Sequence, residues 1–174
     1  MEPPPLPEAY GRVTNPERYR VLHDAADALL IDLEGRYDVT RTDLESFRAN
    51  GRSDAQRAVR ISPNRDDAGP LLVGFTSFPG LFVRFGAWAE EFYPPCGCDA
   101  CDSSPDALIR SLHAHVAALV VGRLSEEIGG TVRPWRRTEW KFDGRGTRTQ
   151  AIERATVREL GGRGRRDWQP WPAR

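Results

Sequence analysis

The clearest pattern in the sequence is a pair of apolar runs separated by a Pro-Gly dipeptide. Residues 71–78 and 81–86 are rich in Leu, Val and Phe. Two apolar runs joined by a short turn are typical of a β-hairpin. Two more segments, 58–61 and 132–142, carry apolar and polar residues in alternation and are predicted to be strands. Both flanking turns, at Asn50-Gly51 and Asp143-Gly144, contain residues that favour tight turns.

Helical periodicity occurs in two places. Apolar residues recur three or four positions apart from Asn15 to about Tyr37, and Asn15 followed by proline is typical of a helix start. A second helix is predicted over residues 105–128, ending at a Gly-Gly dipeptide. This helix is apolar nearly all round, which predicts burial against both the sheet and the first helix. Shorter helical segments are expected at 40–49 and 150–160.

These elements predict an α+β fold for residues 14–174, which form a single domain. A mostly antiparallel sheet of the four predicted strands has the two long helices packed together on one of its faces. Residues 1–13 are proline-rich and are expected to be an extended arm. A domain of this length buries about 70 % of its unfolded-chain surface, so its fold does not require a metal ion.

Charge is distributed unevenly along the chain. Residues 131–174 hold twelve Lys and Arg and five acidic residues, whereas residues 1–130 hold thirteen and twenty. The basic segment also holds four of the five tryptophans, so it could bind single-stranded nucleic acid. The favoured interpretation is that its arginines stack on tryptophans and pair with acids of this chain. Arginine supplies 24 of the 25 basic residues, an imbalance that reflects codon usage better than phosphate binding.

The candidate chemistry lies in one stretch, Pro94–Asp102, which holds all three cysteines in the spacing C-x-C-x-x-C. Zinc binds thiolates in tetrahedral sites, and a C-x-x-C turn can direct two sulfurs at one ion. Cys96, Cys98 and Cys101 are therefore predicted to be zinc ligands. A redox pair of Cys98 and Cys101 and a nucleophilic cysteine are alternatives, disfavoured because no βαβ pattern surrounds the motif.

A tetrahedral site needs a fourth ligand. His23 is the first candidate, because it lies on the helix expected to pack beside the second helix. His113, Asp99, Asp102 and a water molecule are the alternatives. Three clustered cysteines without a signal peptide indicate a reducing cytoplasm, and no apolar run is long enough to cross a membrane.

The predicted function is a non-enzymatic interaction module with a structural zinc site. A metal-dependent or thiol-redox enzyme is one alternative, and nucleic-acid binding through residues 131–174 is another. No catalytic residue is predicted, because no phosphate-binding glycine loop and no Ser/His/Asp arrangement can be identified.

The run from Tyr93 to Asp102 resembles an uncharacterised actinobacterial family, domain-of-unknown-function family 6226. The similarity extends to residues 13–18 and 168–172. This resemblance implies a small stand-alone cytoplasmic protein, and it assigns no activity, catalytic residue or partner.

Overall fold

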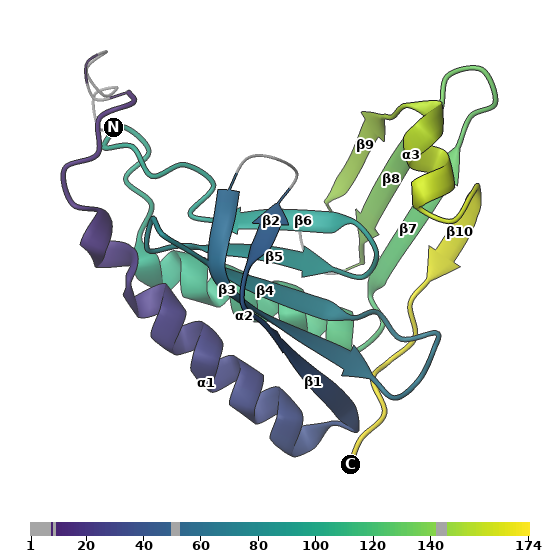
Figure 1. The fold of residues 1–174 in the computed structure, drawn as a ribbon, viewed down its shortest axis with the longest axis horizontal. Helices are drawn as coiled ribbons and strands as arrows, with labels where there is room; N and C mark the ends of the chain where they lie inside the picture. The colour runs from purple at the N-terminus through teal and green to yellow at the C-terminus, as the bar shows by residue number, and fades with distance from the viewer. Residues whose placement is uncertain (1–7, 9, 50–52, 142–145) are drawn as a thin grey trace.

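The computed structural model describes residues 8, 10–49, 53–141 and 146–174. This part of the chain forms two antiparallel sheets and three α-helices (Figure 1), which confirms the predicted α+β class. The first sheet has the order β1-β3-β4-β5-β6, with β2 also paired to β3, and the second has the order β10-β7-β8-β9. The strands of the first sheet are β1 (Val39–Leu44), β2 (Phe47–Ala49), β3 (Ser53–Pro63), β4 (Leu71–Thr76), β5 (Leu81–Phe85) and β6 (Ala89–Tyr93). Those of the second are β7 (Leu124–Gly129), β8 (Trp135–Trp140), β9 (Thr147–Ala151) and β10 (Gly164–Asp167).

Two long helices, α1 (Val21–Arg36) and α2 (Pro105–Val120), lie beneath the first sheet (Figure 1). A short 3-10 helix, Pro16–Tyr19, precedes α1, so the predicted helix start is close to the observed one. The buried residues of α1 recur three or four positions apart because such residues share one side of a helix. They are Leu22, Ala26, Leu30 and Leu33.

The apolar runs of the hairpin are explained by burial on both faces of β4 and β5. One face packs on the helices in the main hydrophobic core, which contains Val73 and Val83. The opposite face forms a smaller cluster with Leu72 and Phe82. A strand buried on both faces has little polar surface, so its sequence is mostly apolar. Arg84 of β5 is the charged exception, and it pairs with Glu90. The predicted hairpin is therefore confirmed as β4 and β5, which pair antiparallel.

The predicted extent of the second helix is wrong. The helix ends at Val120, and residues 124–129 form β7. Gly122 lies in this turn with φ +73°, and a Cβ there would approach the carbonyl oxygen of Trp168 to 2.9 Å. The C-terminal segment therefore passes close to this turn. An apolar stretch of this length is compatible with either a helix or a strand, so its periodicity could not reveal the change.

The predicted single sheet is also wrong. The 132–142 strand exists as β8, but it pairs with β7 and β9 in a second sheet, away from the hairpin. Residues 40–49 form β1 and β2 instead of a helical turn, because both strands pair with β3. The 150–160 segment is divided between the end of β9 and the short helix α3 (Arg154–Glu159). Both predicted turns, Asn50-Gly51 and Asp143-Gly144, and most of the 1–13 arm fall wholly or partly outside the described residues.

A buried carboxylate joins the two sheets. Glu126 of β7 is completely buried and accepts hydrogen bonds from the backbone N–H groups of residues 87–89, which lead into β6. The same carboxylate accepts a fourth hydrogen bond from the indole N–H of Trp168, and all four distances lie between 2.7 and 2.9 Å. Burial raises the pKa of Glu126, and the four donors oppose this shift. Because all four partners are donors, they fit the ionised carboxylate.

The C-terminal segment packs between the sheets and the helices. Trp168 and Trp171 are both 5 % exposed, so these tryptophans pack onto the body of the protein. The indole N–H of Trp171 donates to the carbonyl of Gly69 at 2.9 Å. Ala173 then forms a bridge with Tyr37 at the end of α1. The end of the chain thus ties β10 to the first helix.

Candidate metal centre

The three cysteines lie in the loop between β6 and α2, and their sulfur atoms converge. All three sulfurs lie within 4.8 Å of one another. The separations are 3.2 Å between Cys96 and Cys98 and 3.5 Å between Cys98 and Cys101. In a tetrahedral site with Zn–S bonds of about 2.3 Å, the sulfurs lie about 3.8 Å apart. The arrangement therefore fits three thiolates around one ion with small adjustments.

Local backbone contacts fold this loop. The carbonyl of Cys98 accepts hydrogen bonds from the N–H groups of Cys101 and Asp102, which closes a turn over the C-x-x-C pair. Gly97 lies against the ring of Phe78 at the β4–β5 turn, where a Cβ would overlap the ring. A larger residue at this position would have to displace the Phe78 ring, which favours glycine. The β4–β5 turn thus packs against the cysteine loop through Phe78.

The three thiols differ in burial and in pKa. Cys98 is buried, whereas Cys96 and Cys101 are exposed. Hydrogen bonds from the Cys96 thiol and the backbone of Gly11 lower the pKa of Cys98 to about 6. The neighbouring sulfurs of Cys96 and Cys98 raise the pKa of Cys101 to about 12. A thiolate at Cys98 thus opposes the ionisation of Cys101 by charge repulsion. A divalent cation bound between the sulfurs would offset this repulsion and stabilise the thiolates.

The two acidic candidates for a fourth ligand bind the N-terminal segment. Asp99 accepts hydrogen bonds from Arg12 and from the backbone and hydroxyl groups of Thr14. These contacts, led by the Thr14 N–H, hold the pKa of Asp99 below its usual range. Asp102 pairs with Arg18. The two carboxylates hold residues 12–18 against the cysteine loop.

The structure places the histidine candidates at other contacts. The Nε2 atom of His23 lies 3.0 Å from the carbonyl oxygen of Gly80, and its ring packs edge-on against Phe75. His113 is exposed and lies in an apolar groove between α1 and α2. Among the described residues, the group of potential ligands comprises the three cysteines. The fourth ligand stays a prediction, and His23 would have to exchange its contact with Gly80 for the ion.

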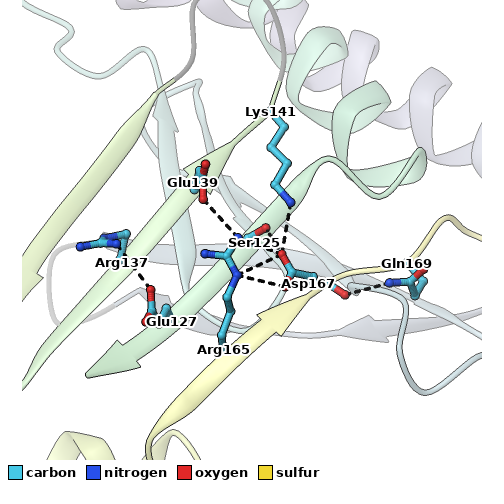
Figure 2. A network of polar contacts seen from close by, with 8 residues as sticks. All are labelled: Ser125, Glu127, Arg137, Glu139, Lys141, Arg165, Asp167 and Gln169. Atoms are coloured by element: carbon cyan, nitrogen blue, oxygen red, sulfur yellow. Dashed lines mark hydrogen bonds and ion pairs between the residues drawn. The ribbon is translucent and has the colours of Figure 1, made fainter. Parts of the chain in front are cut away.

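The basic C-terminal region forms a network of ion pairs on the outer face of the second sheet (Figure 2). Asp167 lies at its centre, where it accepts hydrogen bonds from Arg165, Ser125 and Lys141. These partners, led by Arg165, lower the pKa of Asp167. Arg165 also pairs with Glu139 at 3.3 Å. These charges are complemented within the chain, and nucleic-acid binding stays an untested prediction.

Tryptophan rings contact two further arginines of this region. The guanidinium of Arg137 lies 4.8 Å from the Trp135 ring centroid, and that of Arg166 lies 5.0 Å from the Trp168 ring centroid. Arg137 also pairs with Glu127 at 3.5 Å. Both the stacking and the pairing agree with the favoured interpretation of this segment.

Fold and loop together define an α+β protein with a three-cysteine candidate metal centre. The chain belongs to a family of unknown function, DUF6226, whose model matches residues 2–174. This match confirms the resemblance over the whole chain, while the actinobacterial origin stays an expectation. No curated protein and no solved structure shows a significant match to the chain. In the described part of the chain, every helix is too short or too polar to cross a membrane.

Sequence reasoning missed two features that surround the candidate site. Glu126 fell within the predicted helix 105–128 and was not singled out, although the glycines that flank residues 124–128 could have indicated a separate element. The contacts of Arg12, Thr14 and Arg18 with the loop had no sequence signal, because a polar residue carries no information about a partner more than 80 positions away.

Proposed function

We propose that Cys96, Cys98 and Cys101 bind one zinc ion as thiolates and that this site is structural. The observation that carries the proposal is the convergence of three sulfurs within 4.8 Å in a short loop. Soft thiolate ligands favour zinc over magnesium or calcium, which bind oxygen ligands. His23 is the first candidate for the fourth position, followed by His113, Asp99 or Asp102, and water.

The proposed ion fixes a surface made from two distant parts of the chain. The cysteine loop contacts the hairpin turn through Gly97 and the N-terminal segment through Asp99. A bound ion would hold Asp99 and Asp102 in the positions that engage residues 12–18. The module is thus a non-enzymatic interaction protein whose zinc site orders this surface. A reducing cytoplasm would keep the three thiols available for the metal.

Metal analysis of the purified protein tests this proposal. The wild type is expected to contain one zinc per chain by elemental analysis, and cobalt substitution should give the absorption bands of tetrahedral thiolate coordination. Cys98→Ser should lose most of the metal, whereas Ser103→Ala, beside the loop, should retain it. His23→Gln shows whether that residue contributes. Absence of stoichiometric metal from the wild type would exclude the site.

A thiol-redox function is the second candidate, favoured by the sulfur separations of 3.2 and 3.5 Å and the lowered pKa of Cys98. In that case a mild oxidant would join Cys98 to Cys101 or Cys96, with loss of two hydrogens. A dithiol would then restore both thiols. Mass spectrometry before and after oxidation, with and without bound zinc, distinguishes the two functions, because a structural zinc site predicts that zinc protects the thiols.

A further inference from the structure

A cleft separates β6 of the first sheet from β8 and β9 of the second, and its volume is about 640 Å³. This volume lies in the range typical of small-molecule sites, which is roughly 300–1,000 Å³. Both β6 and β9 are edge strands in the order of their sheets (Figure 1). The cleft is therefore built where the two sheets approach one another, and one end reaches Pro95 beside the cysteine loop.

The register of the second sheet places polar side chains along one wall. Arg136, Thr138 and Trp140 alternate on β8 and line the cleft. On β9, Gln150 lies opposite Arg136, and Arg148 lies opposite Thr138. Side chains that pair across antiparallel strands share a face. One face of the second sheet thus presents two guanidinium groups to the cleft.

Two carboxylates and two guanidinium groups line the cleft, and each carboxylate pairs with an arginine other than Arg136. Glu90 pairs with Arg84 at 2.6 Å, and Glu91 faces Arg148 at 3.8 Å. Arg136 is half-buried, and its Nε donates to the neutral side-chain oxygen of Gln150 at 3.1 Å. Among the described residues, no carboxylate forms an ion pair with Arg136. A guanidinium in the wall of a cleft with no carboxylate partner can bind an oxyanion ligand through charge-assisted hydrogen bonds.

Aromatic side chains form the apolar part of the cleft. His115 and Trp140 line it and contact each other edge-to-face, with ring centroids 5.0 Å apart. Phe92 and Trp88 line the side formed by β6. Flat apolar groups pack well against such rings. The cleft therefore combines an arginine without a carboxylate partner with aromatic side chains, of which His115 and Phe92 are half-buried and Trp140 is 5 % exposed.

We propose that this cleft binds a small organic anion, with its carboxylate or phosphate group on Arg136 and its flat apolar body against Trp140 and His115. A peptide strand added to β6 would fit less well, because Glu90 and Glu91 place charges on this edge and charged edges oppose strand pairing. The proposal concerns β6, β8, β9 and His115 of α2, and it does not depend on metal binding by the cysteines.

A set of probes with one ring and different charges tests the proposal on the wild-type protein. Benzoate and phenyl phosphate carry the anion and the ring, benzamide keeps the ring without charge, and inorganic phosphate lacks the ring. Titrations at constant ionic strength are followed by two-dimensional amide NMR. We expect at least one anionic ring compound to shift the signals of residues 136–140 and 148–150 and to bind about tenfold more tightly than benzamide.

Matched variants assign the binding to Arg136. Arg136→Gln should weaken the anionic ring compound about tenfold, because a charge-assisted hydrogen bond is lost. Arg133→Gln removes an exposed arginine near the same strand and should leave the affinity unchanged. If Arg136→Gln fails to fold, the comparison of benzoate and phenyl phosphate with benzamide still decides.

Several results would overturn the proposal. The first is that neither benzoate nor phenyl phosphate binds. The second is that benzamide binds as tightly as these two anions. The third is that a folded Arg136→Gln protein binds the anionic ring compound with the affinity of the wild type. Inorganic phosphate binding as tightly as phenyl phosphate would exclude a role for the aromatic surface. The stronger of benzoate and phenyl phosphate identifies the anionic group that the cleft accepts.

Discussion

The two sheets have the same antiparallel pairing but are stabilised in different ways. The first sheet packs an apolar face on α1 and α2, and its core is made of aliphatic and aromatic side chains. The second sheet is joined to the first through the buried carboxylate of Glu126, and its outer face carries an ion-pair network around Asp167. The second sheet also has apolar contacts, with Leu124 and Trp140 in the main core and Ile128 against Trp88 and Val157. The contrast is therefore that the first sheet is stabilised mainly by hydrophobic burial, whereas the second adds a buried carboxylate and an ion-pair network to its apolar contacts. The two parts should therefore respond differently to mutation, salt and pH.

The largest effect is expected from a cavity beneath the first sheet. Leu112 of α2 is completely buried in the main core, so Leu112→Ala should lower the free energy of unfolding by about 4 kcal/mol. Urea denaturation measures this change in the free energy of unfolding, and the change should be the same at low and at high salt because the lost contacts are apolar. Ile31→Ala changes a side chain that is 67 % exposed and should cost less than about 0.5 kcal/mol. A similar loss in both variants would contradict this comparison.

The buried carboxylate should be the second most sensitive position. In Glu126→Gln, the NH₂ group of the amide replaces a carboxylate oxygen that accepts hydrogen bonds from N–H groups. Because two donors then face each other, we expect the free energy of unfolding to fall by about 3 kcal/mol. Glu127→Gln is the matched control, because Glu127 is the next residue on β7 and pairs with Arg137 in the exposed network. The control should lose less than about 0.5 kcal/mol. Equal stability of the two variants would show that Glu126 does not join the sheets.

Asp167→Asn should have a smaller, salt-dependent effect. The Asp167 side chain is 47 % exposed, so we expect a loss below about 1 kcal/mol in low salt and less in 1 M salt. Because the folded-state pKa of Asp167 is lowered, its contribution is present above the unfolded pKa of about 3.9 and is lost as the pH falls toward the folded value. Denaturation curves between about pH 2 and pH 6 measure this slope. If Asp167→Asn left the pH dependence of the free energy of unfolding unchanged, this prediction for Asp167 would be wrong.

The smallest global effect is expected at the cysteine loop. Asp99→Asn weakens the contacts with Arg12 and Thr14 at the chain surface, so amide exchange should increase in residues 12–14 while global unfolding changes little. The lowered pKa of Asp99 predicts that the wild-type contact persists above about pH 4 and weakens as the pH falls below it. Hydrogen exchange measured by mass spectrometry tests both statements. A global loss like that of Leu112→Ala would place this segment in the main core.

The parts that the sequence predicted are those in which neighbouring residues carry the information. Helix α1 was predicted because its buried residues recur with the helical period, and the β4–β5 hairpin because both strands are buried on two faces. The cysteine cluster was predicted because its three cysteines lie within six positions of one another. The fourth ligand could not be predicted in the same way, since a residue such as His23 is distant in sequence and its contacts depend on packing.

Local sequence alone determined the α+β class, the first helix, the central hairpin and the convergence of Cys96, Cys98 and Cys101. Only the tertiary structure decided that α2 ends at Val120, that β8 belongs to a second sheet, and that Glu126 is buried between the sheets. The physical reason is that a polar strand can pair with any free edge, and a carboxylate can be buried only where several donors from elsewhere in the chain surround it.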